Sequence, residues 1–419
     1  MTERLLQYIW QFQYFNKTEL ITVDGQSLNI VSPGLFNTNQ GPDFLDARII
    51  LNDTTWAGCI ELHLHSSDWE LHEHSNDKNY GNIILHVVWN NDKDIGVDFP
   101  TIELQSRISK LLLHRYDELM QQKQFIPCEK QLYKVSAITI ATWKERLLIE
   151  RLQQKAMTIL KLLEQNNHHW EEIFWWLLAR NFGSKVNADA FEKMAITIPV
   201  NLLAKRKFQL HQLEALLMGQ AGLLENGFHD DYALELWKEY NFLRKKYSLK
   251  KIHVPIYFLR MRPAGFPTIR LSQLAVLISR SQQLFSIIKE SETTDELFRL
   301  FEVSASAYWN EHYVFDEPAV NQEKKLGNQM IQNIFINTVI PVLYTYGYFL
   351  NNEKYKMRAL RWMEKIPAEA NAITSGFKAI GIAGKTAADS QALIQLKNNF
   401  CDRKCCLQCS IGNSILKEC

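Results

Sequence analysis

The sequence GPDFLDARIILNDTTWAGCIELHLHSSDW occupies residues 41–69 and contains two short apolar runs, 47–51 and 59–65, with a polar break between them. This pattern is typical of two β-strands joined by a turn. Because residues two apart in a strand share a face, Glu61, His63 and His65 are expected to point the same way. Asp43 lies shortly before the first run. The stretch therefore predicts a sheet that gathers several ionisable side chains.

The pattern of apolar residues changes along the chain. Helical spacing covers residues 3–15, short β-branched runs with turn residues follow from about 20 to 97, and helical spacing returns at about 102–122. Pro127 interrupts the pattern, and almost everything from Ala137 onward has helical periodicity. We therefore predict an α/β domain with a mixed sheet at 1–125, a linker at 126–135, and a mainly α-helical domain at 136–419 that ends in a cysteine-rich tail.

Length and composition are those of an ordinary globular protein. The chain has 419 residues, of which 46% are hydrophobic and 22% charged, and its net charge of +1 gives no global sign of a nucleic-acid or membrane partner. The N-terminus lacks the basic region and apolar core of a secretory signal, and no run reaches the roughly 18 apolar residues of a membrane span. We expect a cytoplasmic protein with no membrane contact. The oligomeric state stays open.

Acidic residues and histidines are concentrated around the two predicted strands. Residues 41–80 hold eight acidic residues, only two basic ones and four histidines. Further candidate ligands are His72, His74 and Asp77 in this range and His86 just beyond it. Two carboxylates on neighbouring strands suit Mg²⁺ or Mn²⁺, whereas imidazole with carboxylate suits Zn, Mn or Fe. Such an acidic face would repel phosphate unless a cation neutralised it. The stretch predicts a metal site, while a lone histidine such as His86 is more often a satisfied core residue than a ligand.

The same residues resemble the PD-(D/E)xK nuclease superfamily. Pro42-Asp43 matches the first half of its motif, and Glu61-Leu62-His63 lies where the second half belongs, with histidine in place of lysine. The resemblance implies a restriction-endonuclease-like fold and metal-dependent cleavage of phosphodiesters. It also implies that Asp43 and Glu61 are metal ligands and that Leu62 contributes its backbone carbonyl. The lysine is thought to activate water, so His63 is where this chain departs from the pattern.

Five of the seven cysteines lie in the last nineteen residues. Cys401, Cys406 and Cys409 have metal-binding spacing, and a fourth ligand would be Cys405, Cys419 or the isolated Cys128. Some nucleases of the superfamily named above hold an iron–sulfur cluster with one distant upstream cysteine and a C-terminal trio, and this arrangement resembles theirs in outline. We predict an iron–sulfur or zinc site made by Cys128, Cys401, Cys406 and Cys409.

A basic stretch at 241–270 contains no acidic residue. Tyrosines and phenylalanines are interleaved with its cations, as in grooves that bind single-stranded nucleic acid. A solvated basic face would give the same charge run. The candidate nucleic-acid ligands are Arg244, Lys245, Lys246, Lys250, Lys251, Arg260, Arg262 and Arg270.

Several separated motifs also resemble, in order, an uncharacterised bacterial family, domain of unknown function 2851. They include Gly41-Pro-Asp-Phe, Ser67-Asp-Trp, Ile126-Pro-Cys, Leu178-Ala-Arg-Asn-Phe-Gly and Arg262-Pro-Ala-Gly-Phe-Pro. This resemblance spans nearly the whole chain and implies no established activity.

The residues favour a nuclease-like protein that hydrolyses nucleic-acid phosphodiesters. Asp43 and Glu61 would hold Mg²⁺ or Mn²⁺, and His63 or His65 would orient the water. One alternative is a non-catalytic nucleic-acid-binding or interaction module on a degenerate nuclease fold. Another is a metalloenzyme acting on a small molecule, which requires His63, His65 and His86 to converge.

Overall fold

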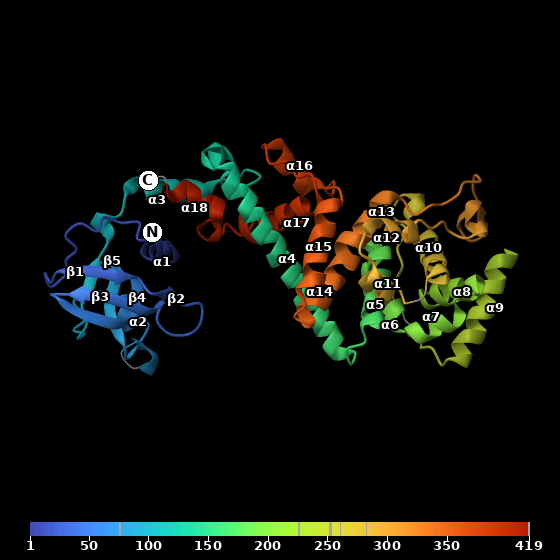
Figure 1. The fold of residues 1–419 in the computed structure, drawn as a ribbon, viewed down its shortest axis with the longest axis horizontal. Helices are drawn as coiled ribbons and strands as arrows, with labels where there is room; N and C mark the ends of the chain where they lie inside the picture. Colours follow the sequence, from blue (N-terminus) through green and yellow to red (C-terminus); the bar gives the residue numbers. More distant parts are fainter. Residues whose placement is uncertain (75–76, 225–226, 251–253, 260, 282, 418–419) are drawn as a thin grey trace. The chain divides into compact units, whose positions relative to one another are not determined.

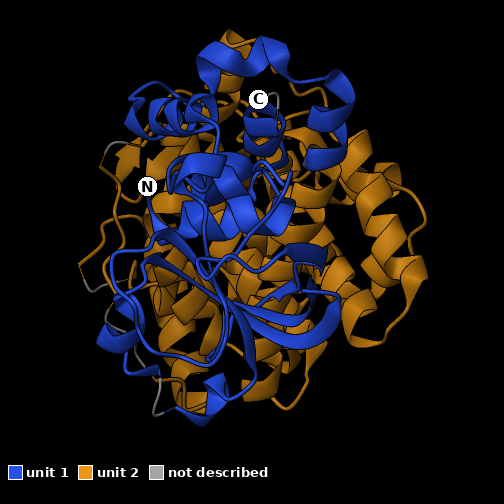
Figure 2. Cartoon of the chain, turned by 90° about the vertical axis from the view of Figure 1, so that its left-hand side faces the viewer, with its two compact units in different colours: residues 1–143, 396–419 blue, residues 144–395 orange. Residues whose placement is uncertain are grey.

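The computed structural model describes residues 1–419 except 75–76, 225–226, 251–253, 260, 282 and 418–419. The chain divides into two compact units, coloured separately in Figure 2. Unit 1 comprises residues 1–143 together with 396–419, and unit 2 comprises residues 144–395. The C-terminal segment thus belongs to the same unit as the N-terminal sheet. Among the described residues, none of the helices combines the length and apolar character that crossing a membrane requires.

Unit 1 is built around a mixed sheet of six strands (Figure 1). The main path runs β1-β3-β4-β5-β6, with β2 paired to β3; β1, β2 and β4 are antiparallel to β3, whereas β5 is parallel to both β4 and β6. The strands are β1 (Leu28–Ser32), β2 (Leu35–Phe36), β3 (Phe44–Leu51), β4 (Thr54–His65), β5 (Ile83–Asn90) and β6 (Thr101–Glu103). The predicted mixed sheet is confirmed.

The hairpin between β3 and β4 fixes the register of the stretch that opens the sequence analysis. Its two-residue loop, Asn52 and Asp53, has φ angles of 44° and 69°. Two successive positive φ angles are those of the tight turn that matches the twist of antiparallel strands. Phe44 then pairs with Ile60, so that Asp43 and Glu61 come to lie at adjacent positions across the two strands.

The helical segments of unit 1 come both from the N-terminal part of the chain and from the segment that begins at residue 396. Helix α1 (Glu3–Phe12) begins at Thr2, whose side chain accepts a hydrogen bond from the Leu5 N–H, and it packs against β4. The other helical segments of unit 1 are α2 (Asp68–Leu71), η2 (Lys78–Tyr80), η3 (Gln105–Arg107), α3 (Lys110–Gln121), η4 (Glu129–Lys134), η8 (Leu396–Cys401), η9 (Cys406–Gln408) and α18 (Ser410–Lys417). Helix α18 contacts α3, beside which it lies in Figure 1, and it also contacts η4 and η9.

Unit 2 is mainly helical, as predicted, with one small hairpin formed by β7 (His312–Val314) and β8 (Glu317–Pro318). Helix α4 (Ala137–Gln165) leads into it. The remaining segments are α5 (Trp170–Phe182), α6 (Ser184–Ile196), α7 (Val200–Arg206), α8 (Leu210–Gln220), α9 (Asp231–Lys246), η5 (Pro263–Gly265), α10 (Pro267–Arg280), α11 (Leu284–Glu290), α12 (Thr294–Phe301), η6 (Ala307–Asn310), α13 (Asn328–Ile334), η7 (Phe335–Val339), α14 (Ile340–Phe349), α15 (Glu353–Lys365), α16 (Ala372–Ala379) and α17 (Ala387–Gln395).

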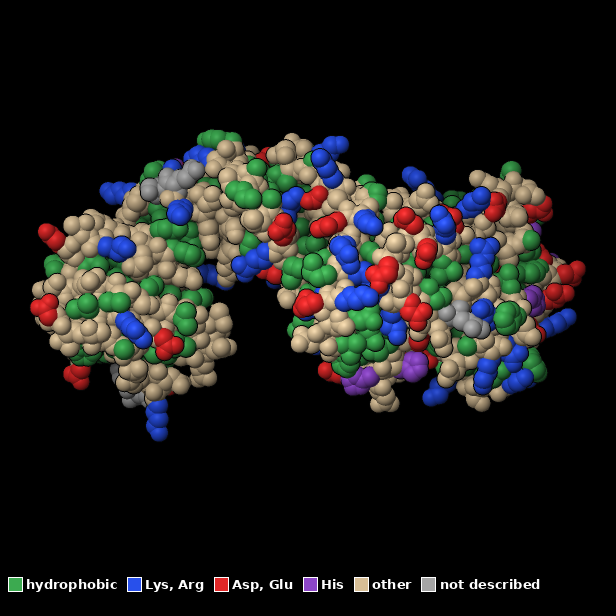
Figure 3. Space-filling view, in the orientation of Figure 1, with side chains coloured by type: hydrophobic (Ala, Val, Ile, Leu, Met, Phe, Trp, Pro, Cys, Tyr) green, Lys and Arg blue, Asp and Glu red, His purple; other side chains and the backbone are tan. Residues whose placement is uncertain are grey.

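Helix pairs form the core of unit 2. Helices α5 and α6, α8 and α9, and α14 and α15 pack on each other, while α10 is buried along most of its length and packs on α8. Gly219 permits one close approach, because a Cβ there would lie 2.2 Å from the ring of Tyr240. On the face seen in Figure 3, basic and acidic side chains are interspersed over the helices.

Candidate metal centre

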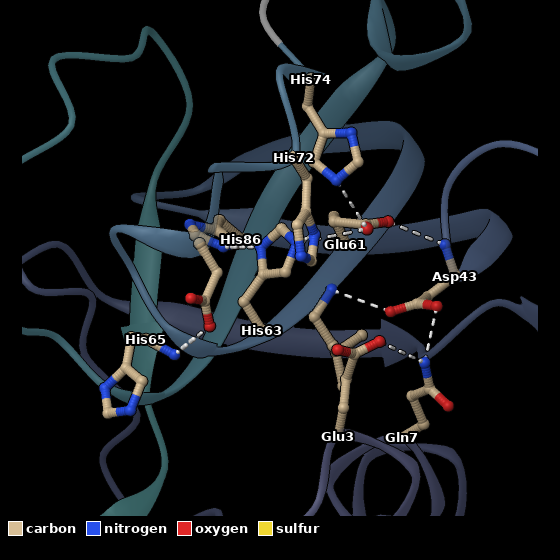
Figure 4. Close-up of polar contacts among 11 residues, drawn as sticks. Glu3, Gln7, Asp43, Glu61, His63, His65, His72, His74 and His86 are labelled. Atoms are coloured by element: carbon tan, nitrogen blue, oxygen red, sulfur yellow. Dashed lines mark hydrogen bonds and ion pairs between the residues drawn. The ribbon is translucent and has the colours of Figure 1, made fainter. Parts of the chain in front are cut away.

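Asp43 and Glu61 are held together by hydrogen bonds from the sheet backbone. The Asp43 N–H donates to Glu61 Oε2 at 3.0 Å, and the Leu62 N–H donates to Asp43 Oδ2 at 3.1 Å (Figure 4). Each carboxylate thus accepts a bond from the strand that carries the other. The hairpin register therefore places the two side chains next to each other.

Helix α1 adds a third carboxylate and an amide to this pair. Gln7 donates from Nε2 to Asp43 Oδ1 at 2.8 Å and to Glu3 Oε1 at 3.3 Å. Sequence reasoning missed both residues. Their signal was present, because Glu3 and Gln7 are four residues apart and therefore share one helix face, but a polar pair on an amphipathic helix is usually solvated.

The environment of these carboxylates disfavours negative charge. Burial raises the pKa of Asp43, although the Gln7 hydrogen bond opposes this, and burial followed by the charge of Asp43 raises the pKa of Glu61 strongly. Glu3 raises both pKa values further. Two adjoining buried carboxylates ionise together at low cost only when a cation lies beside them.

Imidazoles adjoin the carboxylates. His63 Nδ1 lies 2.9 Å from His86 Nε2, and His63 Nε2 lies 3.2 Å from His72 Nδ1. Glu61 Oε1 is 3.7 Å from His63 Nε2 and 3.5 Å from His74 Nε2. Burial and then the neighbouring imidazoles lower the pKa of His63 to about 2, and burial lowers that of His86 to about 4. Both rings are therefore neutral at physiological pH, the state in which imidazole binds metals.

The ligand atoms of His63, His72 and His74 all lie within 4.8 Å of one another, so these three residues could hold a metal ion. The contact from His86 to the second nitrogen of His63 is of the kind that orients a metal-binding imidazole. Trp69 and Tyr80 pack on His74 as walls of the site. We call Asp43, Glu61, His63, His72 and His74 the carboxylate–imidazole centre.

The structure brings together Asp43, Glu61, Leu62 and His63 but leaves His65 outside. The His65 side chain is exposed at the end of β4 and points away from the other histidines (Figure 4). Its backbone N–H donates to Asp68 Oδ2 at 2.9 Å. The sequence pattern named His72 and His74 only as additional ligands, since their positions depend on how the chain turns after β4.

The four cysteines predicted to form a second site come together in unit 1. Burial raises the pKa of Cys401, and charge interactions with Cys128, Cys409 and Cys406 raise it further. Backbone N–H groups of Gly412 and Ile411 donate to Cys409. Contacts of α18 with η4 and η9 join the segment after Cys128 to the C-terminal trio. The alternative ligand Cys405 immediately precedes η9. Cys419 lies outside the described residues.

The basic stretch is divided between different places in unit 2. Arg244, Lys245 and Lys246 occupy the last turn of α9, and Lys250 follows it. Arg262 and Arg270 line a cavity that none of these four residues lines. Lys251 and Arg260 lie outside the described residues.

The protein thus consists of a mixed-sheet unit that carries the carboxylate–imidazole centre and a mainly helical unit. The family model described as "Protein of unknown function (DUF2851)" matches residues 3–372. The chain belongs to that family. Comparison with curated proteins and with solved structures gave no match.

Proposed function

We propose that this protein is a metal-dependent phosphodiesterase acting on nucleic acid. The observation that carries the proposal is the pairing of Asp43 and Glu61 across β3 and β4, with the Leu62 backbone between them. Helix α1, which precedes the strands and supplies Glu3 and Gln7, is compatible with a restriction-endonuclease-like core. The restriction-endonuclease-like fold is itself part of the proposal.

The residues present fit a divalent cation. Asp43, Glu61 and the Leu62 carbonyl are oxygen ligands of the kind that Mg²⁺ and Mn²⁺ bind. Burial, followed by the neighbouring carboxylates, raises the pKa values of Asp43 and Glu61, and a bound cation would favour their ionised forms. The imidazoles of His63, His72 and His74 favour Mn²⁺ over Mg²⁺, because Mg²⁺ prefers oxygen ligands. A bound cation would polarise a phosphoryl oxygen and lower the pKa of water.

The chain's own groups have separable roles in hydrolysis. The water oxygen bonds to phosphorus, the ester P–O bond breaks, and one water proton ends on the leaving oxygen. With its pKa lowered to about 2, His63 is a poor proton acceptor, so its role is to bind and orient. Asp43 and Glu61 would hold the cation beside the attacking water.

Cleavage assays on single- and double-stranded DNA and RNA test the proposal. We expect the full chain to cut at least one of these polymers in Mn²⁺, and Asp43→Asn and Glu61→Gln each to lower the rate by about 100-fold or more. Asp53→Asn is a matched control, because Asp53 is an exposed turn residue of the same hairpin. Absence of cleavage in both Mg²⁺ and Mn²⁺, or equal cleavage by the site variants, contradicts the proposal.

The three close imidazoles favour a second candidate, a metalloenzyme acting on a small molecule. His63, His72 and His74 with Glu61 make a donor set suited to Zn²⁺ or Fe²⁺. Metal analysis of the purified protein separates the two. Stoichiometric zinc or iron that is lost in His72→Ala, without cleavage of any nucleic acid, would support this candidate over the nuclease.

The cysteine site is best explained by an iron–sulfur cluster. Cysteine thiolates hold both structural zinc and iron–sulfur clusters. A cluster spans a wider set of thiolates and accepts N–H donors such as those of Gly412 and Ile411.

Anaerobic purification tests the cluster. We expect bound iron and the visible absorption of an iron–sulfur protein, both lost in Cys401→Ser and Cys409→Ser and both kept in the control Cys59→Ser. Cys59 is a free cysteine of β4 that is not among the four. Stoichiometric zinc that is lost in Cys401→Ser would contradict the cluster, and a metal-free wild-type protein would contradict any metal at these cysteines.

A further inference from the structure

A cavity of about 920 Å³ lies within unit 2, between α4, α5, the segment 261–270 and the helices from 327 to 341. Its lining residues include six cations and, within the described part of the chain, no aspartate or glutamate. The cations are Lys155, Arg180, Lys185, Arg262, Arg270 and Lys325. We call this the cationic cavity. The six cations come from sequence positions up to 170 residues apart. The basic stretch at 241–270 contains only Arg262 and Arg270 of them, so this charge run does not predict the association of all six.

Arg270 is the most telling of these residues. Its guanidinium donates to Gln273 Oε1 at 2.9 Å, while its Nε is buried without a hydrogen-bond partner among the described residues. Burial lowers its pKa, and no acidic group opposes that effect. A half-buried guanidinium whose Nε is buried and whose one hydrogen-bond acceptor is a neutral side chain is costly unless an anion compensates it.

Lys155 presents a second ammonium group to the cavity. Its Nζ donates to Asn337 Oδ1 at 3.0 Å and to the Ile336 carbonyl at 3.3 Å. Both acceptors lie in η7, where the helix has π-type turns, a distortion that is frequent at functional sites. Burial and then the charge of Arg151 lower the pKa of Lys155 to about 7, whereas Glu369 raises it.

The remaining cations differ in how far the protein neutralises them. Arg180 pairs with Asp189 and Glu192, and Lys325 pairs with Glu323 at 3.2 Å. Lys185 and Arg262 are exposed at the cavity and have no ion pair within the described structure. Arg262, Arg270, Lys155 and Lys185 are therefore the groups with charge to offer a ligand.

The geometry points to binding of a phosphoryl group in the cationic cavity, carried by a nucleotide or by the phosphorylated end of a nucleic-acid strand. Guanidinium groups bind phosphate through paired N–H donors, and the volume suits a nucleotide-sized ligand. None of the described residues that line the cavity is aromatic. Recognition would therefore rest on the phosphate rather than on stacking with the base.

Calorimetric titration of the full chain tests this inference. The probes are ATP and two single-stranded dodecanucleotides that differ only in a 5′-phosphate or 5′-hydroxyl group. Chelator in the buffer removes divalent cations, and Asp43→Asn is titrated in parallel, so that binding at the carboxylate–imidazole centre is recognised separately. Failure of the nuclease proposal would leave these titrations unchanged.

We expect one ATP or one 5′-phosphorylated strand to bind per chain, with affinity lowered about tenfold or more by Arg262→Gln and by Arg270→Gln. Arg262 is exposed, so its variant avoids disturbance of the core. The exposed Arg299→Gln in α12 is the matched control and should bind normally. Preference for ATP identifies a nucleotide, and preference for the 5′-phosphorylated over the 5′-hydroxyl strand identifies a strand end. Lack of binding by all probes, or wild-type affinity in both Arg262→Gln and Arg270→Gln, overturns the inference.

Discussion

The carboxylate–imidazole centre of unit 1 and the cationic cavity of unit 2 both bury charge that neighbouring side chains do not neutralise, but the sign is opposite. In unit 1, the carboxylates of Asp43 and Glu61 lie next to each other, and a cation is needed for both to be ionised at low cost. In unit 2, Arg270 has a neutral glutamine as its hydrogen-bond acceptor. Under the two proposals made above, the opposite signs correspond to ligands of opposite charge, a metal ion in unit 1 and a phosphate in unit 2.

The two sites also differ in how the chain assembles them. A two-residue hairpin loop aligns the carboxylates in unit 1, so their proximity is local. The cationic cavity collects residues from several helices and from the segment before α10. A change in the register of the hairpin should therefore act directly on the metal site, whereas many distant changes in helix packing should alter the cavity.

The largest expected effect compares two buried arginines of unit 2. Arg358 is 1% exposed and donates to the Ser291 and Lys289 carbonyls at 2.7 and 2.6 Å, so Arg358→Met should lower the free energy of unfolding by roughly 3 kcal/mol. Arg270→Met should cost under about 1 kcal/mol, because loss of its bond to Gln273 is offset by removal of a buried charge. Chemical denaturation measures both. Equal costs would show that Arg270 is a structural residue.

The next prediction concerns unit 1. Mn²⁺ at 100 times its dissociation constant should stabilise the protein by about 2.7 kcal/mol, since only the folded chain presents the assembled ligands. Hydrogen exchange of peptides from β3 and β4 measures this locally, which suits a chain of two units. Glu61→Gln should abolish the protection, while Asp53→Asn should keep it. Protection that survives in Glu61→Gln would place the cation elsewhere.

A smaller effect of opposite sign is expected for Asp43→Asn without metal. Folding raises the pKa values of Asp43 and Glu61, so the folded state keeps protons that the unfolded chain has released above the ordinary carboxyl range. Their contribution to stability is full below the ordinary carboxyl pKa and is lost as pH rises through the raised values. Asp43→Asn should therefore stabilise the metal-free protein by roughly 0.5–2 kcal/mol at pH 8. The gain should shrink at pH 4, as urea titrations at both pH values would show.

The smallest effect is a pH dependence of anion binding in unit 2. Sulfate keeps its charge between pH 6 and pH 8.5, so a change in its affinity reports on the protein. Lys155, with Arg151 and Glu369 as its charged neighbours, should lose its proton near pH 7, and sulfate affinity should fall by up to roughly tenfold over this range. Lys155→Gln should bind sulfate weakly and without this dependence. An identical pH profile in the variant would exclude Lys155 from the site.

Sequence reasoning predicted the parts of the molecule that depend on short-range structure. The alternation at 59–65 and the turn at Asn52 and Asp53 suffice to predict the hairpin, and with it the proximity of Asp43 and Glu61. The predicted mixed sheet and mainly helical second part are confirmed for the same reason, because hydrophobic periodicity reports local geometry. The family resemblance is confirmed by the match over residues 3–372.

Other residues of the sites could not be ranked without tertiary structure. His65 has the strand phase of His63, yet it lies outside the centre because β4 ends there and the chain turns into α2. Glu3 and Gln7 enter the site only because α1 packs on β4. Spacing singled out the cysteine trio, but only the packing of α18 on η4 brings it to the segment that follows Cys128.

The sequence by itself determined the strand hairpin, the carboxylate pair and the helical character of the second unit, since each follows from interactions between residues close in the chain. Tertiary structure alone decided which histidines meet Glu61 and which cations meet Arg270. Those encounters depend on how whole helices pack, and packing is governed by the combined burial of many side chains rather than by any local pattern. The charges that the fold leaves without compensation are the ones from which both ligand sites were inferred.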